Sequence, residues 1–226
     1  MQEGTTIYFV RHGKTYLNKY NYMQGWANAP LTPEGSAIVH ASGRGLSNVK
    51  FDAVYTSDLA RTRDTARIIL QENLVTDPNI DIIQMPEFRE VFFGSYEGQD
   101  SVKAYDQVAK HNGYESADDM RKQLDNAQIM NAFSRADRSG DAENFSAFWH
   151  RVESGLIQLV QKHRDTEDTI LLVAHGAAIH YIIENIIPDF KATHSLENAS
   201  VSKVRYYDGQ FRLDYYGRTD HFLLEE

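Results

Sequence analysis

Short segments rich in β-branched and aromatic residues alternate with amphipathic segments along this 226-residue chain, and that alternation constrains its fold. Residues 5–10 (TTIYFV) and 169–174 (TILLVA) have the composition of buried strands. Residues 51–56 and 80–85 are further strand candidates. Strands that alternate with helices form a largely parallel sheet with helices on both faces. We therefore predict an α/β fold of three αβα layers around a mainly parallel central sheet.

Helix signals separate the strand candidates. Thr32 is a good N-cap, and Pro33 after it suits the first helical position. Ser57 and Asp58 are predicted to open a second helix, and Pro188 to stop the last. The predicted helices span residues 33–48, 59–72, 145–160 and 177–187. Residues 201–207 and 210–216 are predicted to form a hairpin around Asp208 and Gly209.

The segment from about residue 99 to residue 139 differs from its surroundings. It is polar and predicted to be helical, but its apolar pattern is weak, which is typical of a cap and not of a central core. A chain of this length fits one good-sized α/β domain. We therefore expect residues 1–226 to form a single domain with a helical cap insertion at about residues 99–139.

Composition excludes several classes of partner and chemistry. The formal net charge of −9 repels nucleic acid and anionic membranes, so neither is an expected partner. The absence of cysteine excludes disulfides, thiolate nucleophiles and cysteine-ligated metals. No stretch approaches the roughly 20 apolar residues of a membrane helix, and residues 1–10 lack the features of a signal peptide. We expect a cytoplasmic protein.

Charged side chains follow three of the predicted strands. Arg11 and His12 come directly after residues 5–10, and His175 directly after residues 169–174. Arg61 lies shortly after the second strand. Ligands of parallel sheets bind beyond the carboxyl ends of the strands. The pattern therefore predicts that two histidines and two arginines meet at one edge of the sheet.

The residues around His12 carry a family resemblance. Residues 7–15 (IYFVRHGKT) resemble the signature of the histidine phosphatase superfamily, also called the phosphoglycerate mutase-like family. Asn18 stands where that family carries asparagine. Further blocks similar to the family's follow in family order, at residues 24–26, 30–35, 56–66, 88–98, 173–176 and 198–201. Together the blocks cover most of the chain outside residues 99–139.

The resemblance implies a role for each of five residues. His12 is the implied nucleophile and Glu90 the implied acid that protonates the leaving oxygen. Arg11 and Arg61 are implied to bind the phosphate through guanidinium forks, with His175 as a third donor. A phosphoryl group in transfer spreads negative charge over three oxygens, so such a site needs fixed positive donors. Negative charge nearby is expected to raise the pKa of Glu90.

Further substrate contacts are implied for Asn18, Gln24 and Gly25, while no metal and no other cofactor is expected. Glu87 and Glu97 lie near Glu90 but are expected to be solvated loop carboxylates. The histidines without a matching block are interpreted as surface or packing residues: His40, His111, His150, His163, His180, His194 and His221. Trp26 fits either a structural plug or a pocket wall.

The same histidine serves phosphatases and phosphoglycerate mutases of this family, so the motif alone does not separate them. Residues 93–98 look like the phosphatase branch. The family's mutases carry paired arginines and proline-rich segments, whereas this chain has no Arg-Arg pair and residues 99–139 contain no proline. We therefore expect a metal-independent phosphomonoester hydrolase for a small phosphorylated metabolite. The alternatives are a phosphoglycerate mutase-type phosphotransferase, a catalytically silent phosphate-binding module, and a metal-dependent phosphatase.

The sequence leaves open whether the chain forms a homodimer. The predicted hairpin is rich in tyrosine, at Tyr206, Tyr207, Tyr215 and Tyr216. These side chains fit either a homodimer contact or the core.

Overall fold

A computed structural model describes residues 4–219 and shows a mixed six-stranded sheet in the order β3-β2-β4-β1-β5-β6. Its strands are β1 (Thr5–Arg11), β2 (Ala53–Thr56), β3 (Ile82–Gln84), β4 (Thr169–Ala174), β5 (Val201–Tyr207) and β6 (Gln210–Arg218). The first four strands are parallel, and the β5–β6 hairpin adds antiparallel to β1. The predicted mainly parallel sheet is confirmed.

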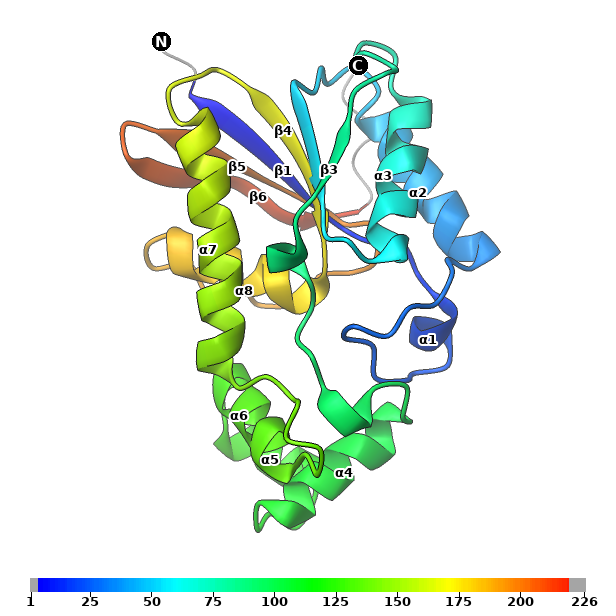
Figure 1. Cartoon of the computed structure of the whole chain (residues 1–226), viewed down its shortest axis with the longest axis vertical. Coiled ribbons are helices and arrows are strands. Elements are labelled where there is room, and N and C mark those ends of the chain that lie inside the picture. Colours follow the sequence, from blue (N-terminus) through cyan, green and yellow to red (C-terminus); the bar gives the residue numbers. More distant parts are fainter. Residues whose placement is uncertain (1–3, 220–226) are drawn as a thin grey trace.

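Helices cover both faces of the sheet, so the three-layer prediction is also confirmed (Figure 1). Alternate residues of β1 point to opposite faces. Ile7 and Phe9 belong to the core under α7 (Phe145–His163) and α8 (Gly176–Ile186). Tyr8 and Val10 belong to the core under α2 (Pro33–Gly45) and α3 (Ala60–Glu72).

Three further helices lie beyond the sheet, at the lower end of the molecule in Figure 1: α4 (Ser101–His111), α5 (Ala117–Gln123) and α6 (Asn126–Ala136). We refer to them as the cap helices. Each begins at a side chain that accepts a backbone N–H of the first turn, in order Asp100, Ser116 and Asp125. Their apolar residues form a separate cluster around Phe133, so the expectation of a weak apolar pattern in this segment is wrong.

Element boundaries shift slightly from the predicted ones. The strand candidates at residues 51–56 and 80–85 shorten to β2 and β3, and α2 ends at Gly45, three residues early. Leu59, not Ser57 or Asp58, is the N-cap of α3, and it has no side-chain cap. The Ser57 hydroxyl contacts His175 instead.

The segments between sheet and cap are irregular. They contain α1 (Tyr16–Lys19) and the single 3₁₀ turns η1 (Pro86–Phe88) and η2 (Gly94–Tyr96). Tyr22 pairs with Asp100, which ties the loop after α1 to the start of the cap helices. None of the helices within residues 4–219 combines the length and apolarity needed to cross a membrane.

Candidate active site

The predicted convergence at the carboxyl edge of the sheet is present in the structure. β1 and β4 are parallel neighbours, and the His12 N–H continues their pairing by donating to the Ala174 carbonyl at 3.0 Å. His175 follows β4 directly, so the two rings lie at the same edge, with centroids 5.2 Å apart. Arg61 reaches the same place from the first turn of α3.

The hydrogen bonding of His12 fixes which ring nitrogen is free. Nδ1 lies 2.8 Å from the Gly13 carbonyl oxygen, which can only accept, so Nδ1 carries the proton. Nε2 then keeps its lone pair, as a nucleophile requires. Burial, followed by the charges of Arg61 and Arg11, holds the pKa of His12 well below its ordinary value of 6.5. The ring is therefore neutral at physiological pH.

His175 has protein partners on both ring nitrogens. Nδ1 accepts from Arg61 Nη2 at 3.0 Å, and Nε2 lies 2.8 Å from the Ser57 hydroxyl. Burial, then the charge of Arg61, holds the pKa of His175 well below 6.5. The resemblance implies a donor to phosphate here, whereas in this arrangement the ring orients Arg61. A contact between His175 and phosphate would require one of these partners to be exchanged.

Arg11 and Arg61 each present a donor with no partner. Arg61 is fully buried, and its terminal nitrogens donate to the carbonyls of Gly25 at 2.6 Å and Ala27 at 3.0 Å. Arg11 donates through Nη1 to the Leu196 carbonyl. The Nε atoms of both arginines are buried and unpaired among the described residues. Burial lowers the pKa of Arg61 to about 10, which leaves it charged at neutral pH.

Glu90 lies in the loop between η1 and η2, at the N-terminus of α8. Its two oxygens accept the N–H groups of Ala177 and Val91, each at 3.0 Å. Burial raises the pKa of Glu90 above its ordinary value of 4.5, against the opposing effect of those N–H groups and of Arg11. Glu90 therefore holds a proton to higher pH than an exposed glutamate does.

Glu97 has a structural role that the sequence analysis missed. Its carboxylate accepts four backbone N–H groups at 2.9–3.1 Å, from residues 25–27 and from Phe93. The expectation of a solvated carboxylate is therefore wrong for Glu97. Residues 25–27 also supply the carbonyls that hold Arg61, so Glu97 orients that arginine indirectly. Nothing in the local sequence distinguishes it from other loop glutamates.

Gly25 positions Arg61 and has no room for a side chain. A Cβ at this position would lie 2.0 Å from the Val91 carbonyl oxygen and 2.3 Å from the Glu97 carboxylate. Glycine is thus required because the segment from Val91 to Glu97 approaches the backbone closely. The Gly25 carbonyl accepts from Arg61 and its N–H donates to Glu97, while its implied substrate contact stays a prediction.

Arg151 of α7 is a second residue that the sequence analysis missed. It donates to the backbone carbonyls of Glu87 at 2.8 Å and Glu90 at 3.1 Å, and it pairs with Glu143 at 2.8 Å. Trp26 donates from its indole nitrogen to the same Glu90 carbonyl at 2.9 Å. Both side chains fix the Glu90 backbone through its carbonyl, and Trp26 lines neither hollow, so Trp26 has the structural role and is not a pocket wall.

Asn18 and Gln24 form one network beside His12. Asn18 Oδ1 accepts from the Thr15 N–H at 3.2 Å and from Asn198 Nδ2 at 3.4 Å, while Asn198 also donates to the His12 carbonyl. Gln24 accepts from the Thr15 hydroxyl at 2.6 Å. These contacts use the carbonyl oxygen of Asn18, so its amide nitrogen is the group left to bind a ligand.

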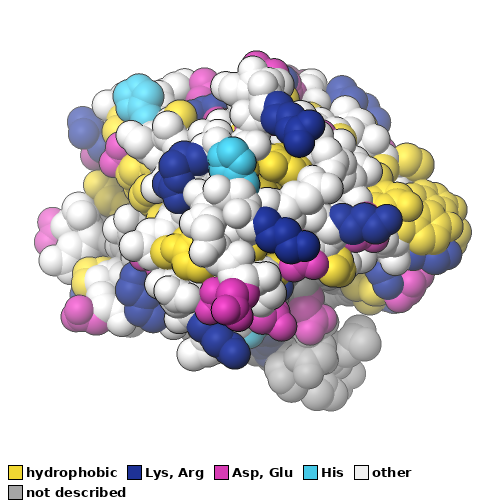
Figure 2. Space-filling view, turned by 90° about the horizontal axis from the view of Figure 1, so that it is seen from below, with side chains coloured by type: hydrophobic (Ala, Val, Ile, Leu, Met, Phe, Trp, Pro, Cys, Tyr) yellow, Lys and Arg dark blue, Asp and Glu magenta, His cyan; other side chains and the backbone are white. Residues whose placement is uncertain are grey.

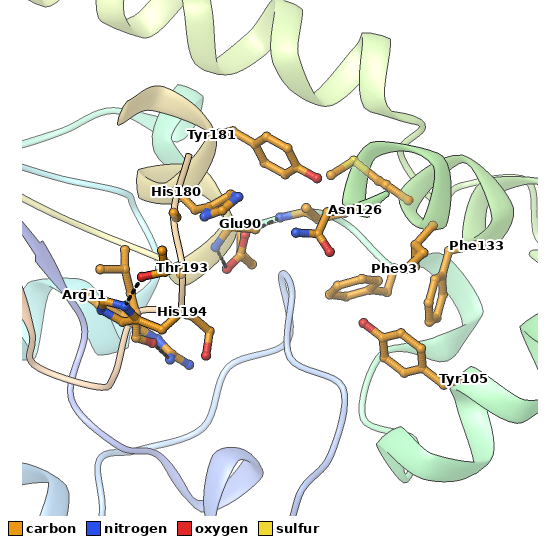
Figure 3. Close-up of a pocket in the computed structure, with 18 residues that line it drawn as sticks. Arg11, Glu90, Phe93, Tyr105, Asn126, Phe133, His180, Tyr181, Thr193 and His194 are labelled. Carbon is orange, nitrogen blue, oxygen red and sulfur yellow. Dashed lines mark hydrogen bonds between the residues drawn. The ribbon is translucent and has the colours of Figure 1, made fainter. Parts of the chain in front are cut away.

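A cavity of about 540 Å³ runs from Arg11 and Glu90 to the cap helices. Figure 3 shows Glu90 in its middle, between Arg11 on one side and the aromatic Phe93 and Tyr105 on the other. A second hollow of about 600 Å³ shares Glu90, Phe93 and Tyr105 with the first and reaches Gln24. Both volumes are typical of sites for small molecules.

Two histidines without a family block also line the first cavity, His180 and His194. The sequence analysis did not predict this, because only the folded structure places residues 180 and 194 in the same cavity as Glu90. Within residues 4–219, no three or more histidine and carboxylate side chains gather as a metal site would need. Figure 2 shows acidic and basic side chains interspersed over the face seen from below.

Comparison with known proteins defines the class of this fold and site. The family model of the histidine phosphatase superfamily (branch 1) matches residues 7–219, so the chain belongs to that superfamily. It is 26% identical to the uncharacterized phosphatase PhoE of Bacillus subtilis, over 96% of each chain. It is 27% identical to the probable phosphoglycerate mutase GpmB of Escherichia fergusonii, over 91% of this chain and 86% of that one.

Solved structures agree with this assignment. A phosphoglycerate mutase from Bacillus anthracis has a TM-score of 0.90 and 29% identity, and the match covers 97% of this chain and 95% of that one. YhfR of Bacillus stearothermophilus has a TM-score of 0.71 and 25% identity, over 97% of this chain and all of the other. The relatives thus bear the names of both phosphatases and mutases.

Proposed function

We propose that the protein is a metal-independent phosphomonoester hydrolase that acts on a small phosphorylated metabolite through a phosphohistidine at His12. The observation that carries the proposal is the pair of buried, unpaired Nε donors of Arg11 and Arg61 beside a neutral histidine. A buried donor without a partner is costly, and a phosphate oxygen would satisfy it. Membership of the superfamily supports the same reaction.

In the first step, His12 Nε2 attacks phosphorus and the bond between phosphorus and the ester oxygen breaks. Arg11 and Arg61 stabilise the charge that spreads over the equatorial oxygens. Glu90 gives its proton to the leaving oxygen, which departs as an alcohol. The raised pKa of Glu90 favours the protonated form that this step needs.

In the second step, water attacks the phosphoryl group on His12. Glu90, now a carboxylate, takes a proton from that water, and the bond between phosphorus and Nε2 breaks. Inorganic phosphate leaves, with His12 neutral and Glu90 protonated as at the start. The hydrogen bond from Nδ1 to the Gly13 carbonyl keeps Nε2 aimed at phosphorus throughout.

A mutase activity is the second candidate, because the structural match with a TM-score of 0.90 bears that name. A phosphoglycerate carries a carboxylate that a mutase must hold while the phosphoryl group returns. Among the described residues, Arg11 is the single lysine or arginine that lines the first cavity, and it is assigned to the phosphate. Arg121 lines only the second hollow, where its guanidinium stacks on Tyr105. The hydrolase is therefore the better-supported proposal.

The test follows products by phosphorus NMR. The protein receives 3-phosphoglycerate with a trace of 2,3-bisphosphoglycerate, and in parallel a panel of phosphate esters, all in chelator. We expect inorganic phosphate without 2-phosphoglycerate, loss of release in His12→Ala, and unchanged release in His150→Ala, an exposed histidine of α7. Formation of 2-phosphoglycerate would establish the mutase, and equal phosphate release by His12→Ala would refute the nucleophile.

A further inference from the structure

The cavity at Glu90 has a wall whose chemistry differs from that of the phosphate end. Phe133 packs edge-on against Tyr105 and Phe93, with centroids 4.9 Å and 5.5 Å apart, and all three line the cavity with Ile129 and Met130. A phosphate held at Arg11 would therefore direct its ester group into aromatic and aliphatic surroundings. The described lining of this cavity offers a second anionic group no lysine or arginine besides Arg11, since Arg121 stacks on Tyr105 from the second hollow.

Tyr181 adds an unused polar group to this wall. It lies on α8 and is 6% exposed, and its hydroxyl is buried without a hydrogen-bond partner among the described residues. Figure 3 shows the ring reaching from α8 toward the cap helices, on the same side of Glu90 as Asn126. Buried tyrosine hydroxyls ordinarily have a partner, so an unpaired one at a cavity wall is informative.

The hydroxyl is suited to donate to an uncharged oxygen. Burial raises the pKa of Tyr181, so the group keeps its proton across the physiological range. Next to Tyr181 on α8, with the ring centroids 5.2 Å apart, burial lowers the pKa of His180 despite the nearby Glu184, which favours a neutral ring. Neither side chain therefore offers a charge to a carboxylate or a second phosphate.

We propose that Tyr181 determines substrate specificity by donating a hydrogen bond to a hydroxyl or carbonyl oxygen on an uncharged, largely apolar leaving group. This inference rests on the proposed hydrolase function and names its substrate class. The phosphate lies at Arg11, the body of the leaving group lies among Phe93, Tyr105 and Phe133, and its oxygen meets the Tyr181 hydroxyl. Because that hydroxyl is buried, a neighbouring side chain must move, and Met130 on the same wall has the unbranched, adaptable side chain for it.

The test compares 2-naphthyl phosphate with its ring-hydroxylated derivatives, a set of positional isomers that differ in where the hydroxyl is attached, for the wild type and Tyr181→Phe. We expect the wild type to prefer at least one hydroxylated isomer by about 3- to 10-fold in kcat/KM, as one neutral hydrogen bond allows. Tyr181→Phe should lose that preference, measured as the ratio of its kcat/KM for the hydroxylated substrate to its kcat/KM for 2-naphthyl phosphate. The ratio of the two preferences cancels differences in leaving-group reactivity.

Tyr20→Phe is the matched control, because Tyr20 is an exposed tyrosine (56%) that lines neither hollow. It should keep the wild-type preference. If hydrolysis depends on His12 but no isomer is preferred, or the preference survives in Tyr181→Phe, the specificity contact is refuted and the hydrolase stands. If the wild type hydrolyses no ester of the series, the leaving-group class is refuted, and failure across the whole ester panel would refute the hydrolase itself.

Discussion

At the scale of single residues, the site depends on environments that set the protonation of His12 and Glu90 in opposite senses. Burial keeps His12 neutral far below pH 6.5, whereas burial keeps Glu90 protonated above pH 4.5. A nucleophile and an acid are thus available together in mildly acidic solution. Pairs of groups whose pKa values are moved apart are typical of acid–base sites.

This arrangement predicts the pH dependence of the proposed hydrolase activity. For an alkyl phosphate, kcat/KM should fall as the pH rises above 4.5, because Glu90 loses the proton that the leaving oxygen needs. Glu90→Gln should lower kcat by about 10²- to 10⁴-fold and flatten that alkaline limb. Rate profiles of both proteins check this. An alkaline limb that persists unchanged in Glu90→Gln would assign it to another group.

At the scale of elements, loops and caps hold the reactive side chains in place. Glu97 accepts four N–H groups, three from residues 25–27 and one from Phe93. Residues 25–27 also provide the two carbonyls that accept from Arg61. Glu97→Gln should lower stability by roughly 1–3 kcal/mol, since an amide cannot accept all four bonds. It should also raise KM, because Arg61 loses its support.

Urea unfolding and steady-state kinetics measure the two effects of Glu97→Gln. Glu34→Gln is the control, because Glu34 has an exposed side chain (62%) that pairs with Lys14 on the surface. That change should alter stability by less than about 1 kcal/mol. Equal effects of the two substitutions would mean that the loop does not depend on Glu97.

Asp137 joins the end of α6 to the loop that contains Ser95. Its carboxylate accepts from the Ser95 N–H at 3.0 Å, the Ser139 hydroxyl at 2.7 Å and the Ala142 N–H at 2.9 Å. Burial alone would raise the pKa of Asp137, but hydrogen bonds led by those of Ser95 and Ser139 hold it below 3.8. The ionised form therefore stabilises the fold above pH 3.8, and that stabilisation is lost as the pH falls further.

Asp137→Asn should accordingly destabilise the protein at neutral pH, and the difference from the wild type should shrink at about pH 3. Urea unfolding at the two pH values measures it. Asp141→Asn, an exposed neighbour, should have little effect at either pH. A loss of stability for Asp137→Asn that is the same at both pH values would argue against a stabilising role of the ionised Asp137 carboxylate.

The elements also show what the sequence can and cannot predict. β4 has its predicted bounds because Thr169 and the five buried apolar residues after it form one run that ends at His175. The edge strand β3 is shorter than predicted, because it pairs with β2 alone and over only three residues. Arg151 and Glu97 bind backbone groups of distant loops, and no local pattern encodes such contacts. Tyr181 and His180 read as one turn of an apolar helix until the fold places them at a cavity.

At the scale of the whole molecule, a chain of net charge −9 concentrates positive charge in one buried place. Arg11 and Arg61 are held there by three backbone carbonyls from two loops, and the Nε donor of each is unpaired among the described residues. The native fold therefore carries an electrostatic cost that an oxyanion can relieve. Binding of phosphate should be linked to the stability of the entire chain.

Inorganic phosphate is accordingly expected to raise the Tm. At 100 times its Kd, phosphate should add about 2.7 kcal/mol to the free energy of unfolding. Arg61→Lys should reduce the shift, because lysine cannot supply the guanidinium fork. Arg67→Ala, on the exposed face of the same helix, should keep it. Calorimetry with chloride at equal ionic strength is the reference, and an equal rise with chloride would contradict a specific site.

The central claim is that phosphoryl transfer passes through His12. The most direct measurement quenches the wild type in alkali during turnover of 2-naphthyl phosphate and maps phosphorylated peptides by mass spectrometry. We expect one phosphoryl group on the peptide that contains His12, and none when His12→Ala is treated in the same way. Phosphorylation of another residue, or turnover by His12→Ala without a phosphoenzyme, would contradict the account.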